Sequence, residues 1–125
     1  MNPIRPDGFE GERSDCTVRA LSSVTKIDYA TVHKVLTQAG RKRGRGINFR
    51  FVADDVFTSL NLNSWKVKSE KTKTITVDKF VKKYPKGRFL CLKRGHAFPI
   101  INGEYYDVKS KNVRIIIAWK LEVKE

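Results

Sequence analysis

Cys16, His96 and Asp107 are the residues whose types and order could do chemistry. Ser14 and Asp15 are typical N-cap residues, so we expect Cys16 to begin a helix. The unpaired N–H groups and the dipole at a helix N-terminus favour a thiolate there. His96 is expected to open a strand, and Asp107 lies just beyond the turn that follows that strand. This order is typical of a cysteine nucleophile with an imidazole base and an orienting acid.

The three side chains predict a reaction of the acyl-transfer type. His96 would take the proton of Cys16, and Asp107 would hold the ring by accepting a hydrogen bond from its other nitrogen. The thiolate would attack a carbonyl carbon, and water or an amine would resolve the acyl-enzyme. The backbone N–H of Cys16 could donate to the oxyanion. In the alternative, structural interpretation, Cys16 is a buried small residue and His96 packs at a strand end.

The apolar pattern places these residues on an α+β fold. Helical spacing predicts a helix from the N-cap to about Thr25 and three further helices, whereas a period of two predicts strands in the second half of the chain. We therefore expect N-terminal helices, with the cysteine on the first, packed on a C-terminal antiparallel sheet. The further helices are expected at 28–39, 51–60 and 77–84, and the strands at 64–68, 88–93, 96–101, 104–108 and 113–123.

The pair Asn102-Gly103 predicts how the imidazole and the acid meet. Asn-Gly between two strand-like runs favours a two-residue type I′ turn. That register places Phe98 opposite Asp107, and His96 shares the face of Phe98. Asp107 would then be a diagonal neighbour of His96, with Cα atoms within about 7–8 Å. A slip of one residue would move Asp107 to the other face.

Length and composition indicate one folded domain, residues 1–125, in which 1–13 is an extended lead-in. Two cysteines form no disulfide framework, and no pair of Cys and His has zinc-ligand spacing, so neither a metal nor another cofactor is expected. We interpret Cys91 and His33 as packing residues. No apolar run approaches the ~20 residues of a membrane span, and the N-terminus lacks the apolar region of a signal peptide. The expected location is the cytoplasm.

The net charge of +13 and a pI near 10 favour an acidic partner, either nucleic acid or an acidic protein. A glycine-punctuated loop carries much of this charge and is not a P-loop, since no GK[ST] follows. Its residues could bind phosphate, or the loop could be only a solvated surface segment. Lysines repeat again from 66 to 73, and we expect the two clusters to form a continuous patch. The candidate nucleic-acid contacts are Arg41, Lys42, Arg43, Arg45 and Arg50.

The segments around the three candidate residues resemble the papain-like cysteine peptidases in their smallest, single-domain form. Ser14-Asp15-Cys16-Thr17-Val18-Arg19-Ala20, Gly95-His96-Ala97, and Asn102-Gly103 with Asp107 carry the resemblance. It is greatest to short papain-like proteins encoded by bacteriophages and bacteria. The resemblance implies that Cys16 is the nucleophile, His96 the base and Asp107 the orienting residue. It also implies the host cytoplasm, if a phage encodes the chain.

The chain departs from that family at one position. Papain-like enzymes often have a Gln a few residues before the cysteine, which donates to the oxyanion, but this region has Glu10 and Glu12. A carboxylate cannot donate and would repel an oxyanion. Two hypotheses follow: a cysteine peptidase, isopeptidase or related hydrolase that uses another donor such as Ser14 or an asparagine, or an inactive papain-like fold that binds nucleic acid or an acidic host protein through its basic surface.

Overall fold

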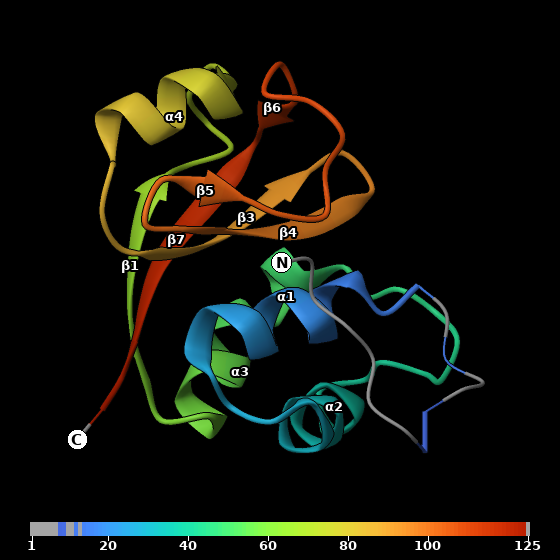
Figure 1. Cartoon of the computed structure of the whole chain (residues 1–125). Coiled ribbons are helices and arrows are strands. Elements are labelled where there is room, and N and C mark those ends of the chain that lie inside the picture. Colours follow the sequence, from blue (N-terminus) through green and yellow to red (C-terminus); the bar gives the residue numbers. More distant parts are fainter. Residues whose placement is uncertain (1–7, 10–11, 13, 125) are drawn as a thin grey trace.

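The computed structural model describes residues 8–9, 12 and 14–124, and most of the predicted lead-in, with Glu10, lies outside them. The described chain folds into helices on both sides of an antiparallel sheet, which confirms the α+β class (Figure 1). None of the helices in this part of the chain has the length and apolarity that crossing a bilayer requires.

The helices begin close to the predicted positions because their capping residues act locally. The Asp28 side chain accepts from the N–H of Thr31, and the Thr76 hydroxyl accepts from the N–H of Lys79. The third helix starts two residues later than expected, since a short 3₁₀ turn precedes it. The helices are α1 (Cys16–Thr25), α2 (Tyr29–Gln38), α3 (Ala53–Ser59) and α4 (Val77–Lys83), and the 3₁₀ turn is η1 (Phe49–Phe51).

The main sheet has the strand order β1-β7-β3-β4-β5, with antiparallel pairing throughout. A second, two-stranded sheet pairs β2 with β6. Residues Arg88–Lys93 and His96–Ile101 form strands with the predicted bounds. The strands are β1 (Leu62–Lys68), β2 (Ile75–Thr76), β3 (Arg88–Lys93), β4 (His96–Ile101), β5 (Glu104–Tyr105), β6 (Arg114–Ile115) and β7 (Ile117–Val123).

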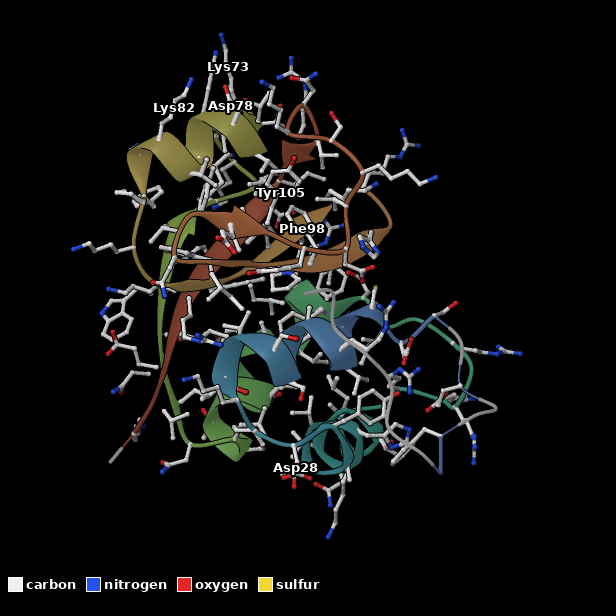
Figure 2. The ribbon with its side chains drawn as sticks, viewed as in Figure 1. Asp28, Lys73, Asp78, Lys82, Phe98 and Tyr105 are labelled. Carbon is white, nitrogen blue, oxygen red and sulfur yellow. The ribbon has the colours of Figure 1, made fainter. Side chains whose placement is uncertain are left out.

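The sheet separates two apolar clusters. Helices α1, α2 and α3 cover one face, with α1 directly against β4, and α4 covers the other (Figure 1). Leu90 and Trp119 point toward the three helices, whereas Phe89 and Phe98 pack with Phe80 of α4. In Figure 2, the labelled Phe98 lies in the sheet between the α4 layer and the three helices below. This packing fixes α1 against β4, and with them the elements that carry Cys16 and His96.

Two predicted strands are shorter than expected. The strand expected at 104–108 ends at Tyr105, and the strand expected at 113–123 divides at Ile116. At the division, the N–H of Ile116 donates to the carbonyl of Leu92 at 2.8 Å outside the regular ladder. The residues before this point pair with β2 in the small sheet instead.

Candidate active site

Cys16 is the first residue of α1 and is half-buried. Asp15 occupies the predicted N-cap position, but its side chain makes no capping hydrogen bond. Instead, the buried Asp15 carboxylate accepts from Arg19 Nε at 3.0 Å and from the Tyr29 hydroxyl at 2.7 Å. These bonds hold the start of α1 against α2, and the thiol is placed where the first-turn N–H groups of the helix favour its anion.

His96 is the first residue of β4 and follows the two-residue turn Arg94-Gly95. Because α1 packs on β4, the N–H of Ala97 donates to Cys16 Sγ at 3.4 Å, and the His96 ring lies beside the same thiol, where each group shifts the pKa of the other. The structure thus brings together the thiol and the imidazole that the sequence singled out.

The pKa values of the two groups move in opposite directions. Burial, the largest influence, raises the pKa of Cys16, but hydrogen bonds from His96, the Ala97 N–H and Thr17, with the His96 charge, bring it below 9.0. The hydrogen bond to Cys16 raises the pKa of His96 above 6.5; burial opposes this, and the Asp107 carbonyl and carboxylate support it. Each shift favours a thiolate–imidazolium pair.

Asp107 reaches His96 differently from the sequence-based prediction. The chain leaves the sheet after Tyr105, and Asp107 adopts a left-handed conformation with φ of 63°. His96 Nε2 donates to the backbone carbonyl of Asp107 at 2.8 Å, whereas the Asp107 carboxylate Oδ2 is 3.7 Å from that nitrogen. The expected carboxylate–imidazole hydrogen bond is therefore replaced by a carbonyl–imidazole bond. Because Nε2 carries the proton, Nδ1 is the ring nitrogen left for Cys16.

The turn that precedes Asp107 has the predicted geometry. Asn102 and Gly103 both have positive φ, of 50° and 81°, as a type I′ turn requires. Ile101 pairs with Glu104, which confirms the register at the turn. The rings of His96 and Phe98 stack with centroids 6.4 Å apart, so they share a face as expected.

Arg19 was not among the residues predicted to act at the site. Its Nε contacts Asp15, and its NH1 donates to Asp107 Oδ2 at 2.8 Å. Asp15 and Arg19 have the spacing of a helical ion pair, a signal that the sequence does contain. The contact with Asp107, 88 positions away, has no local signal.

A groove of about 730 Å³ opens beside the thiol and the imidazole. Asn48 and Ser14 are exposed side chains on its wall, and both could donate hydrogen bonds into it. Asn48 occupies the N-cap position of η1 without a side-chain capping bond. The lining also includes Ile47, Phe49, Leu92, Ile116 and Ile117, and the charged residues Arg19, Arg50, Lys93 and Arg94.

Glu12 does not lie in this groove. Its carboxylate is buried and accepts from Arg41 NH1 at 2.9 Å, from the N–H of Gly44 at 2.6 Å and from His33. Burial would raise the pKa of Glu12, but these bonds, with that to Arg41 the largest, lower it to about 2. Glu12 is thus a structural anion, and it is not among the residues that line the groove beside Cys16. His33 packs with Phe9 and Tyr29, as a structural role predicts.

The basic loop is only partly a surface feature. Arg41 was predicted to contact nucleic acid, but it is 2% exposed and its guanidinium is bound to Glu12, so this prediction is wrong. Arg50 is exposed and pairs with Glu70 at 2.5 Å. The exposed basic residues of the loop itself are Lys42, Arg43 and Arg45.

The second lysine cluster also contains a buried member. Lys68 is 9% exposed, and its ammonium donates to the Thr72 hydroxyl at 2.6 Å and to the carbonyls of Ser69 and Thr72. It stabilises the 69–72 turn and does not contribute to an exposed patch. The continuity of the remaining surface charge stays a prediction.

Cys91 is buried in β3, where desolvation raises the pKa of its thiol well above 9.0. The two cysteines therefore differ sharply in environment, since only Cys16 opens onto the groove. No group of three or more His, Cys, Asp or Glu in the described residues could hold a metal ion.

Comparison of the chain with protein families, with curated proteins and with solved structures found no significant match.

Proposed function

We propose that this chain is a small thiol-dependent hydrolase or acyl transferase, a peptidase or isopeptidase of papain-like type. The observation that carries the proposal is that α1 and β4 bring Cys16 and His96 to one groove, where the N–H of Ala97, next to His96, donates to Cys16 Sγ. Cys16 begins a helix, His96 begins a strand, and both line the same groove. If both were only packing residues, there would be no reason for these three features to meet at one place.

The first half of the reaction uses the thiolate as the nucleophile. His96 accepts the proton of Cys16, and the Cys16 sulfur forms a bond to the substrate carbonyl carbon while the carbonyl electron pair moves to oxygen. As the tetrahedral intermediate collapses, the bond to the leaving amine breaks and the amine takes the proton from His96. The product is a thioester on Cys16 and a free amine.

The second half regenerates the thiol. His96 takes a proton from water, and the hydroxide oxygen adds to the thioester carbonyl. Collapse breaks the carbon–sulfur bond, releases a carboxylic acid and returns the proton to Cys16. Replacing water by an amine in this step gives acyl transfer instead of hydrolysis.

The oxyanion needs donors in place of the glutamine that many papain-like enzymes use. The backbone N–H of Cys16 at the start of α1 is one donor. Asn48 supplies the second in this proposal, because its amide is on the groove wall and is not used to cap η1. Glu12 does not oppose this arrangement, since its charge is buried with Arg41.

Asp107 acts as a positioning residue in this scheme. Its carbonyl accepts from His96 Nε2 and fixes the tautomer, and its carboxylate accepts from Arg19 and so ties the Asp107 loop to α1. A papain-like arrangement is further supported by the packing of the cysteine-bearing α1 on the histidine-bearing β4. The thiol needs a reducing compartment, and the cytoplasm expected from the sequence (the host's, if a phage encodes the chain) meets that need.

The test is the formation of an acyl-enzyme from a p-nitrophenyl ester. We expect a burst of p-nitrophenol followed by slower turnover, and mass spectrometry should locate the acyl group on Cys16. Cys16→Ala should abolish the burst, and Cys91→Ala serves as a control for the second thiol. Absence of a burst, or acylation of lysines alone, would contradict the proposal.

A second candidate function is binding of nucleic acid or an acidic protein by an inactive papain-like domain. The exposed Lys42, Arg43 and Arg45 favour it. If it holds, a labelled duplex should bind with an affinity that falls steeply as salt rises, because binding releases counterions. Replacing these three residues by Gln should abolish binding, whereas Cys16→Ala should not. Equal binding by the triple variant would remove this loop as the interface.

A further inference from the structure

The charged side chains that line the groove are all positive. Arg19, Arg50, Lys93 and Arg94 contribute to its wall, and no Asp or Glu of the described residues does. A cleft with charge of one sign concentrates ligands of the opposite sign, because its low-dielectric walls focus the field. The whole chain has 13 Asp and Glu residues beside 26 Lys and Arg, so its composition alone does not require a groove without acidic residues.

Two of these four charges are already neutralised. Arg19 pairs with Asp15 and Asp107, and Arg50 pairs with Glu70. Lys93 and Arg94 form no ion pair within the described residues; the Lys93 ammonium donates only to the Arg94 carbonyl, at 3.4 Å. The uncompensated charge of the groove is therefore concentrated on the turn between β3 and β4.

This turn lies immediately beside the imidazole. Lys93 and His96 are directly opposed in the β3–β4 register, with Arg94-Gly95 as the turn between them. Side chains of directly opposed residues start about 4.5–5.5 Å apart. In a bound peptide, the carboxylate held by Lys93 or Arg94 would therefore belong to a residue one or two positions from the carbonyl held at Cys16.

The rest of the lining suits a peptide. Ile47, Leu92 and Ile116 are partly buried apolar residues on the groove wall and would pack against an apolar side chain. A phosphate backbone would gain little from such a surface. An acidic residue next to an apolar one would use both parts of the lining.

We propose that the substrate is an acidic peptide segment, with an Asp or Glu side chain adjacent to the scissile acyl bond and bound by Lys93 and Arg94. The inference rests on the proposed function for the chemistry at Cys16, but the charge preference of the groove is measurable without any turnover.

The test compares alkylation of Cys16 by anionic iodoacetate and by neutral iodoacetamide in the folded protein, with mass spectrometry to locate the adduct. We expect the iodoacetate-to-iodoacetamide rate ratio to exceed that of the urea-unfolded chain by about fivefold at low salt, and to decrease as salt rises. Lys93→Gln/Arg94→Gln should bring the ratio close to the unfolded value. The matched control Lys66→Gln/Arg114→Gln removes the same charge from exposed positions outside the groove lining and should retain it.

An equal ratio in the wild type and in Lys93→Gln/Arg94→Gln would overturn the proposal, and so would an equal loss in the control variant. A failure of the proposed function would give a different result. Cys16 would then react slowly with neutral iodoacetamide, whatever the iodoacetate-to-iodoacetamide ratio. Protection of Cys16 by a short Glu-containing peptide, but not by its Gln analogue or by inorganic phosphate, would assign the carboxylate. Protection by phosphate alone would overturn the peptide assignment.

Discussion

Arg19 donates from NH1 to the Asp107 carboxylate at 2.8 Å and thereby connects the helix that bears the thiol to the loop that holds the imidazole. The same guanidinium contacts Asp15 at the N-terminus of α1, and Asp15 in turn accepts from Tyr29. A continuous series of hydrogen bonds thus runs from α2 through α1 to the Asp107 loop. It orients the groups around the thiol without contacting it.

Arg19 should therefore act as a positioning residue. Arg19→Gln is expected to lower acyl-transfer kcat/KM by about tenfold, since small displacements of the imidazole are costly. It should also shift the pH profile of Cys16 alkylation, which loss of stability alone would not do. Lys82→Gln, which breaks the exposed Lys82–Asp78 pair on α4, is the matched control (Figure 2). Unchanged kcat/KM and pH profile in Arg19→Gln would contradict the role.

The parts of this site that the sequence predicts are those with local signals. The bounds of β4 and the type I′ turn follow from short-range patterns around Asn102-Gly103. The approach of Asp107 does not, because the chain leaves the sheet after Tyr105 and the acid contacts the ring through its carbonyl. The prediction for Asp107 is wrong because it assumes that the strand continues to this residue, whereas β5 ends at Tyr105.

Buried charge is the other part that the sequence does not reveal. Arg41 lies among other basic residues and looks like a surface residue, but its partner Glu12 is 29 positions away. Lys68 alternates with apolar residues like an edge-strand lysine, yet its ammonium also contacts the carbonyl of Ile116. Burial of both follows from tertiary contacts, which no local pattern encodes.

Asp107→Asn should be tolerated better than a catalytic acid would be. The carbonyl that accepts from His96 is retained, and asparagine adopts positive φ readily. We expect kcat/KM within about tenfold of the wild type and a lower pKa for His96, because the negative charge that helps to raise it is gone. Asp107→Val, which disfavours the left-handed conformation, should lose much more activity. Similar losses in the two variants would contradict the account.

Glu12 should make stability depend on pH in the acid range. Its pKa is lowered from 4.5 to about 2, so its contribution is present above pH 4.5 and disappears as the pH falls toward 2. Glu12→Gln should lower the free energy of unfolding at pH 7 by roughly 3 kcal/mol, since it also leaves Arg41 buried without its anion. Urea unfolding at pH 7 and pH 2 measures both effects.

The control for this prediction is Glu122→Gln, whose side chain is 54% exposed beside Lys120. It should change the free energy of unfolding by less than about 0.5 kcal/mol at either pH. If Glu12→Gln behaves like Glu122→Gln, the buried network is not stabilising the fold.

Asn48→Ala should separate oxyanion stabilisation from thiol activation. Without the amide donor, kcat for ester turnover is expected to fall by about 100-fold. Alkylation of Cys16 by iodoacetamide forms no oxyanion, so its rate should stay within about twofold of the wild type. Asn63→Ala, at an exposed position of β1, is the control and should change neither rate. Parallel losses of turnover and alkylation in Asn48→Ala would contradict the assignment.

The pH dependence of Cys16 alkylation by iodoacetamide in the folded protein tests the thiolate–imidazolium pair most directly. In the wild type, the inflection of the alkylation rate should lie at lower pH than that of the urea-unfolded chain, because His96 and the Ala97 N–H lower the pKa of Cys16. The buried Cys91, whose pKa is raised, should not react. His96→Gln should move the inflection toward higher pH. A Cys16 that titrates like a free thiol near pH 8.5 in both proteins, or that does not react while the chain is folded, would contradict the account.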